Sequence, residues 1–340
     1  MARVDQIFGF RMVLLLLLTV GVYPTLSAQA LPDVPELPGV PGEPVVPILP
    51  GDGDMQFIIS HPFDVRSISL GSATLSDRWN LSPMGVNASL LALREPDLAV
   101  QFNSAHYWSD NRMISSVTLP TLSAGSHRIS GRFGASHQST NQFNYLETPS
   151  LPEFDLQVYL ADVAYAYRFS NAFSMGVLNR FTHIENEERE LVTYTVDLGL
   201  VYAPQGKITY ALIARGMGRH GMYGSDSTGK MLLRSSSQEA SIELGATINY
   251  PIQSRPILSI SFSNEKRLYE DGIWYKGGVE VLPFPMIALR SGLQFHLEQS
   301  LAIPRFGTGI HLGWFHLDYM VSPYVRTGEQ YHQLGVTLEF

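Results

Sequence analysis

The chain has 340 residues, of which 45% are hydrophobic and only 16% charged, and its formal net charge is −8. Soluble domains usually carry about a quarter of charged residues, so this composition favours a protein with apolar surface to hide. The acidic balance without basic clusters argues against nucleic-acid binding. The absence of cysteine excludes disulfides and thiolate metal sites.

The first part of the chain, residues 1–30, has the pattern of a secretory signal peptide. Arg3 and Arg11 precede an apolar core at 12–22, and Ala28-Gln29-Ala30 is an A-x-A cleavage site. The apolar run is too short to span a bilayer comfortably as a helix, and no later stretch reaches the required length. We therefore expect an exported protein without a transmembrane helix.

Two further segments precede the first clear strand. Residues 31–56 hold most of the prolines, which remove backbone donors and favour an extended polyproline form. We interpret them as a Pro-rich periplasmic linker, with a docking motif for a partner as the alternative. Residues 57–96 are irregular, with turn signals and one short helix at 89–93, and we expect them to form a plug or hatch.

Apolar and polar residues then alternate in recurrent segments to the end of the chain, as in β-strands. In the clearest segment, 191–202, apolar Tyr194 and Leu198 alternate with polar Thr195 and Asp197. Fourteen strands are predicted, at 98–107, 113–120, 127–137, 157–169, 173–182, 191–202, 207–216, 239–250, 256–263, 273–282, 286–297, 306–312, 315–322 and 331–340.

The number of strands predicts the architecture of residues 97–340. A closed sheet of this size has an interior that apolar side chains cannot fill, so its apolar face must point outward into lipid. We therefore predict an all-β fold, a closed antiparallel transmembrane β-barrel of about 14 strands with an N-terminal plug segment. A soluble sandwich of two sheets, which also alternates, remains the structural alternative.

The end of the chain supports a membrane barrel. Alternation continues to Phe340, as is typical of outer-membrane barrels, and we interpret Phe340 as a signal for the barrel assembly machinery. Connections counted back from a periplasmic C-terminus alternate between short periplasmic turns and longer external loops. The predicted loops include 183–190, 217–238 and 298–305.

Several short motifs occur in an order that resembles the PorV/PorQ-like outer-membrane proteins of the FadL-like β-barrel superfamily. They are G-V-N-A-S-L-L at 85–91, with Ala88 where the family motif has Pro, D-V-A-Y-A-Y at 162–167, F-S-M-G-V at 173–177, V-D-L-G-L-V-Y at 196–202, G-G-V-E at 277–280, A-L-R-S-G at 288–292 and D-Y at 318–319. The resemblance implies a fourteen-stranded barrel with an N-terminal segment in or under the pore. It also implies either transport of hydrophobic small molecules or an accessory role in type IX secretion.

Charged residues on the polar faces of strands are the candidate lumen-lining groups. They are Asp162, Arg168, Asp197, Glu243, Lys276, Glu280, Arg290 and Glu339. Such groups set what passes through a pore or clamp its plug. Alternatively, opposite charges pair across the barrel and hold a solvated interior together.

No motif in the chain indicates catalysis. It has no H-E-x-x-H or G-x-S-x-G pattern, and its ten histidines are scattered. We expect no catalytic, metal-binding or cofactor-binding residues. The leading hypothesis is a channel in the outer membrane of a diderm bacterium, with outer-membrane lipid, a hydrophobic ligand or secretion-system proteins as partners. The alternatives are an assembly protein whose external loops dock a secreted partner and an outer-membrane hydrolase.

Overall fold

The structure is a computed structural model that describes most of the chain after residue 63. The described ranges are 64–80, 83–93, 99–107, 112–139, 155–186, 189–204, 208–225, 231–234, 240–250, 256–268, 270–323 and 330–339. They belong to the compact unit Phe57–Phe340. The predictions for the signal peptide at 1–30, the linker at 31–56 and Phe340 therefore lie outside the described residues.

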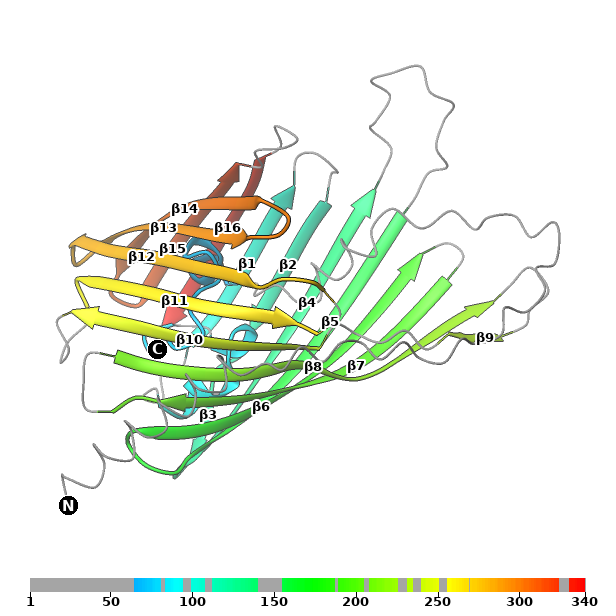
Figure 1. Cartoon of the computed structure of the whole chain (residues 1–340), viewed down its shortest axis with the longest axis horizontal. Coiled ribbons are helices and arrows are strands. Elements are labelled where there is room, and N and C mark those ends of the chain that lie inside the picture. The colour runs from blue at the N-terminus through cyan, green and yellow to red at the C-terminus, as the bar shows by residue number, and fades with distance from the viewer. Residues whose placement is uncertain are drawn as a thin grey trace. The chain divides into compact units, whose positions relative to one another are not determined.

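Fourteen antiparallel strands form a closed barrel (Figure 1). They are β1 (Ala99–Tyr107), β2 (Arg112–Thr118), β4 (His127–Ser139), β5 (Asp155–Arg168), β6 (Phe173–Asn186), β7 (Arg189–Tyr202), β8 (Ile208–Ser225), β10 (Ser241–Tyr250), β11 (Leu258–Arg267), β12 (Trp274–Phe284), β13 (Ile287–His296), β14 (Leu301–Leu312), β15 (Phe315–Pro323) and β16 (Gln330–Glu339). Two short strands are attached to this ring. β3 (Leu122–Ala124) pairs with β4, and β9 (Met231–Arg234) pairs with the far end of β8.

Closure of the ring rests on continuous ladders between strands far apart in sequence. β1 pairs with β16 from Ala99↔Glu339 to Tyr107↔Tyr331. On the other side, β8 pairs with β10 from Ile208↔Ile248 to Arg215↔Ser241. Because every strand of the ring has two neighbours, the predicted closed barrel is confirmed and the sandwich alternative is wrong.

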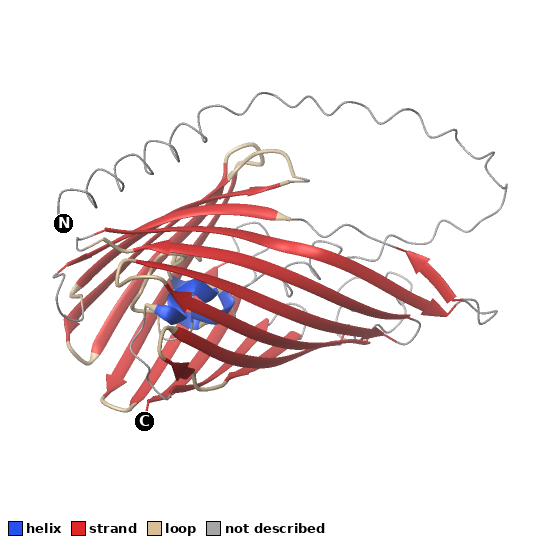
Figure 2. Ribbon diagram, turned by 90° about the horizontal axis from the view of Figure 1, so that it is seen from below, coloured by secondary structure: helices blue, strands red, loops and turns tan. Residues whose placement is uncertain are grey.

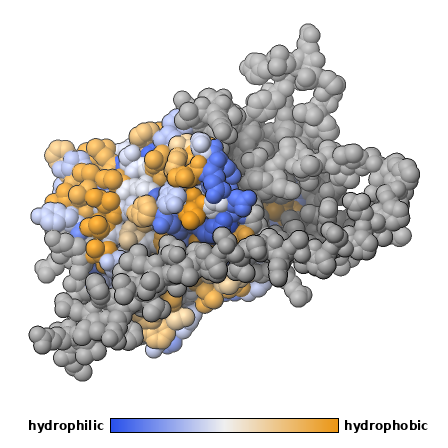
Figure 3. Space-filling model, in the orientation of Figure 1, coloured by the Kyte–Doolittle hydropathy of each residue, from blue (hydrophilic) through white to orange (hydrophobic). Residues whose placement is uncertain are grey.

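The barrel is inverted in polarity relative to a soluble domain. On β7, Val192 and Leu198 are 40% and 44% exposed on the outside, while Thr193 and Asp197 are 1% and 3% exposed inside. Figure 3 shows large apolar side chains gathered on the outer face in that view. The predicted orientation of the two faces is therefore confirmed.

Strand ends differ from the prediction by four or more residues in four strands, two of which, β6 and β11, continue to Asn186 and Arg267. The strand predicted at 207–216 continues to Ser225, because the Gly-rich stretch after Gly216 pairs with β7. The strand predicted at 306–312 begins at Leu301 and includes Pro304, which lies beyond the ladder to β15 and so needs no donor on that side. The predicted loops 217–238, 183–190 and 298–305 are consequently shorter than expected.

Within the described residues, three short helices precede the barrel strands in sequence, α3 (Val65–Ser69), η1 (Pro83–Gly85) and η2 (Ala88–Ala92). Side chains cap two of them, since Asp64 accepts a hydrogen bond from the Ser67 N–H and Asn87 accepts one from the Ser89 N–H. The strands enclose these helices (Figure 2). In the described part of the chain, no helix is both long and apolar enough to cross a membrane.

Candidate functional site at the inner segment

The candidate site is the contact between the barrel wall and residues 64–80 and 83–93, here called the inner segment. Its first half, 64–80, lies against β10 and β12 to β16, where Val65 and Ile68 pack on Met320 of β15. Its second half, 83–93, lies against β5 to β8. The inner segment thus contacts both sides of the barrel interior.

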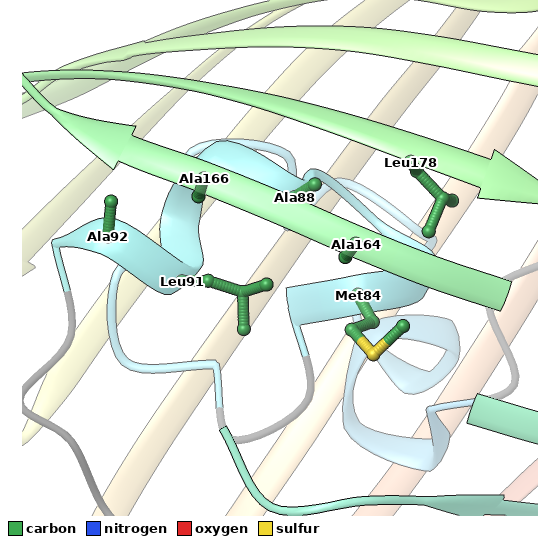
Figure 4. Packing of buried hydrophobic residues seen from close by; sticks show 7 residues of the cluster. All are labelled: Met84, Ala88, Leu91, Ala92, Ala164, Ala166 and Leu178. Carbon is green, nitrogen blue, oxygen red and sulfur yellow. The ribbon is translucent and has the colours of Figure 1, made fainter. Parts of the chain in front are cut away.

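Apolar clusters hold the second half in place. Met84 and Leu91 pack on Leu178 of β6 and on small alanines of β5 (Figure 4). Leu75 and Leu90 form another cluster with inward-facing residues of β7 and β8. Each buried aliphatic side chain contributes about 1.5–3 kcal/mol, so these contacts offset the cost of ordering the segment inside a polar barrel.

Glycines in the wall allow the first half to approach closely. The backbone of Leu70 and Gly71 lies where side chains at Gly278 and Gly292, paired on β12 and β13, would stand. A β-carbon at either position would overlap backbone atoms, which cannot move aside as a side chain does. Glycine at these two positions therefore makes room for the inner segment.

Arg66 anchors the first half through buried ion pairs. Its Nε and Nη2 donate to the Glu280 carboxylate at 2.9 and 2.8 Å, and its Nη1 lies 2.5 Å from Asp77 Oδ2. Glu280 also accepts from Arg290, which bonds Asp318 at 2.5 Å. Burial by itself lowers the pKa of Arg66, but Asp77 and Glu280 overcome this, and the pKa is raised well above its ordinary value. Arg66 is therefore a permanent cation.

A second charge cluster lies on the wall formed by β4 to β6. Asp162 pairs with Arg132 on one side and with Arg180, at 3.1 Å, on the other. All three are at most 5% exposed. The three residues occupy directly paired positions, so they form one row across three strands.

A third cluster joins the inner segment to β8. Arg215 Nη2 donates to the Val86 carbonyl at 2.6 Å and to Glu243 at 3.3 Å. Glu243 also accepts from Lys276, which pairs with Glu265 at 2.9 Å. One arginine therefore connects the second half of the inner segment to the wall.

The structure places most of the predicted lumen-lining residues in these clusters. Asp162, Asp197, Glu243, Lys276, Glu280 and Arg290 are all buried on the inner face, between 1% and 8% exposed. Arg168 and Glu339 are half-buried, and Glu339 lies 3.3 Å from His316. Opposite charges are thus paired, as in the alternative interpretation. Four of the residues also clamp the inner segment directly or through one partner, namely Glu280, Arg290, Glu243 and Asp197.

Sequence reasoning missed the arginines that complete the clusters. Arg66 belongs to a helix of five residues, which is too short to show a repeating hydrophobic pattern. Arg215 stands near the end of the strand predicted at 207–216. Arg132 and Arg180 lie on inward positions of predicted strands, so strand parity was a signal that could have found them.

The motifs behind the family resemblance converge on the inner segment. Asn87 of the N-A-S-L string meets Gly199 of the D-L-G string on β7. Gly278 and Glu280 of β12 face Gly292 and Arg290 of β13, next to Leu70, Gly71 and Arg66. Motifs that are far apart in sequence therefore meet at one structural contact.

The described residues bring together no group of three or more His, Cys, Asp or Glu side chains suited to a metal ion. The contacts between the inner segment and the wall are apolar packing, hydrogen bonds and ion pairs.

Comparison with solved structures identifies the fold. The toluene transporter TbuX of Ralstonia pickettii superposes with a TM-score of 0.58 at 12% identity, over 83% of this chain and 98% of that one. This chain has the fold of a FadL-like transmembrane β-barrel. The toluene transporter TodX of Pseudomonas putida gives 0.57 at 10% identity, over 80% of this chain and 96% of that one.

A FadL homologue of Pseudomonas aeruginosa gives a TM-score of 0.53 at 9% identity, over 80% of this chain and 96% of that one. No family model and no curated protein matches the sequence. At these identities the likeness to the FadL-like barrels concerns the fold.

Proposed function

We propose that this protein is an outer-membrane channel that admits hydrophobic small molecules past the inner segment. Support comes from the apolar outer face of a closed barrel, which suits lipid, and from the FadL-like fold. Solved proteins of that fold include toluene transporters. No catalytic step is part of this proposal.

The observation that carries the proposal is the way in which the inner segment is held. It contacts opposite sides of the interior through small apolar clusters and through single arginines, without being part of any strand. Contacts of this kind can break locally while the ladders of the barrel remain intact. A solute would pass when one part of the inner segment moves aside.

A disulfide between the inner segment and the wall tests this proposal. Ser76 Oγ and Thr247 Oγ1 of β10 lie 2.9 Å apart, so cysteines at these positions can be joined. The chain has no cysteine of its own, so the pair Ser76→Cys and Thr247→Cys would be the only thiols. We expect uptake of labelled toluene by intact cells to fall to background in the oxidised protein and to recover after reduction.

The two single-cysteine variants are the controls, because they carry the same substitutions without the cross-link. Both should transport as the parent does, with and without oxidant. Equal uptake by the oxidised and reduced double variant would contradict passage past the inner segment. Equal uptake by cells with and without the protein would contradict the channel itself, at least for this class of solute.

A second candidate function is an assembly or secretion role of the PorV/PorQ type, including type IX secretion. The observation that favours it is the length of β8, whose residues after Arg215 extend beyond the ladder to β10 and whose end, from Met222 to Ser225, pairs with β9. This β8–β9 hairpin would offer a docking site for a secreted partner. Removal of 218–236, a span that includes β9, would abolish export of such a partner while leaving toluene uptake intact.

A further inference from the structure

Strands β8 and β10 separate next to the second half of the inner segment. Arg215 is the last residue of β8 that pairs with β10. Among the described residues, 217–221 of β8 pair only with β7, and β9 joins β8 at Met222. Arg215 therefore stands where one strand leaves its neighbour.

A β-bulge shapes the wall at the same place. Asp197 of β7 faces two residues of β8, Arg215 and Gly216, because the ladder shifts between Val196 and Leu198. Gly216 has φ +68°, and its N–H donates to Asp197 Oδ1 at 2.8 Å. Bulges of this kind re-aim a side chain, and here the re-aimed side chain is that of Arg215.

Besides Glu243, the guanidinium of Arg215 has two acceptors within reach. It now donates to the Val86 carbonyl of the inner segment at 2.6 Å. Its Nη1 already forms a long ion pair, at 3.9 Å, with Asp197 Oδ2, a buried carboxylate oxygen that has no hydrogen-bond partner. A buried, unsatisfied carboxylate oxygen is costly, so a shift of the guanidinium toward Asp197 would be favourable in itself.

We propose that Arg215 is a two-position latch that holds the second half of the inner segment through Val86 and releases it by moving to Asp197. Glu243 lies 3.3 Å from Nη2, the nitrogen that also bonds Val86, and keeps the guanidinium near both partners when it moves from one to the other. The latch regulates the passage proposed above and so rests on that function. Because the latch concerns a motion of the chain, it is measurable without any solute.

Amide hydrogen exchange of the folded protein in detergent tests the latch. The amides of Asn87, Leu90 and Leu93 are hydrogen-bonded within the second half, so their exchange reports its release. We expect Arg215→Met to raise exchange in 83–93 by about tenfold, the effect of losing one charge-assisted hydrogen bond. Asp197→Asn should lower exchange in 83–93, because it removes the competing partner while keeping an acceptor for Gly216.

Lys266→Met is the control. Lys266 donates to the carbonyl oxygens of Glu270 and Gly272 at 2.6 and 3.0 Å, and these bonds belong to none of the three charge clusters and do not reach the inner segment. This variant should leave exchange in 83–93 unchanged. If Arg215→Met does not fold, Arg215→Lys, which keeps the charge but loses the planar fork, should raise exchange by a smaller factor.

The opposite signs of the two variants are decisive. A merely structural role for the Arg215–Asp197 pair predicts that both substitutions raise exchange in 83–93, and that result would overturn the latch. Unchanged exchange in the arginine variant would overturn it as well. Failure of the toluene experiment with these exchange results intact would overturn the proposed solute, not the latch.

Discussion

At the scale of single residues, glycines of the barrel wall leave room for the inner segment because they have no side chain. Gly292 faces inward, and a β-carbon there would overlap the backbone of Gly71. Gly277, fifteen residues earlier, also belongs to the ladder of β12 and β13, but no atom within 4 Å would meet its β-carbon. The two glycines therefore differ in role, although both stand in similar strands.

This difference gives a matched pair of substitutions. Gly292→Val should lower the free energy of unfolding by about 3 kcal/mol or more. The valine side chain would overlap the backbone of Gly71 and displace the inner segment from the wall. Gly277→Val should be close to neutral, since a β-branched residue suits an open position on a strand. Denaturant unfolding in detergent measures both, and equal losses would contradict the close approach at Gly292.

The sequence predicted a residue's position correctly where the alternation along a strand decides whether its side chain points inward or outward. The period of two placed Glu280 and Arg290 on the inner face, and both are buried there. It could not predict that Arg66, far away in the sequence, completes their ion pairs, because partners across a lumen depend on tertiary contacts. Arg215 was missed for a related reason, since a bulge changes the local register without a strong sequence signal.

At the scale of elements, the inner segment consists of two halves that are anchored separately. Arg66 holds 64–80 to β12, and Arg215 holds 83–93 to β8. Each anchor joins a short irregular element to a long regular strand. The two halves are also joined to each other, since Asn87 Nδ2 donates to the Leu75 carbonyl at 3.2 Å and Leu75 packs in one cluster with Leu90.

Arg66→Met should destabilise the protein by roughly 3–5 kcal/mol, because it leaves the carboxylate of Asp77 buried without its cation. The double variant Arg66→Met with Asp77→Asn should recover part of this loss, since the uncompensated charge is removed. Denaturant unfolding of the two variants and the parent measures the recovery. No recovery in the double variant would show that the Arg66–Asp77 pair is not the source of the loss.

Strands with clear alternation of apolar and polar residues were predictable from the sequence, whereas the glycine-rich end of β8 and the short helix α3 were not. All fourteen ring strands were predicted, because each alternates for long enough to be recognised. The second half of β8 was interpreted as a loop because its glycines have low strand propensity, which the neighbouring β7 overrides. Helix α3 has only five residues and is stabilised by burial and by its Asp64 cap, so it left no periodic signal.

At the scale of the whole molecule, apolar side chains cover the outer face of the barrel and charged side chains lie inside it, which is the reverse of a soluble domain. Phe181, Tyr194 and Leu198 are between 39% and 50% exposed on the outside, while the charge clusters lie within. Such a surface is unfavourable in water and favourable in a bilayer. The proposed channel function depends on this apolar outer face and charged interior.

A cysteine scan along β7 tests the inversion most directly. Single cysteines at 192–201 would be labelled with a fluorophore in the protein reconstituted in lipid, on a background free of native thiols. A quencher confined to the lipid tails should quench labels at Val192, Tyr194 and Leu198 and leave those at Thr193 and Thr195 bright. Equal quenching at neighbouring positions, or quenching of the threonine positions instead, would contradict a barrel with an apolar outer face around a polar interior.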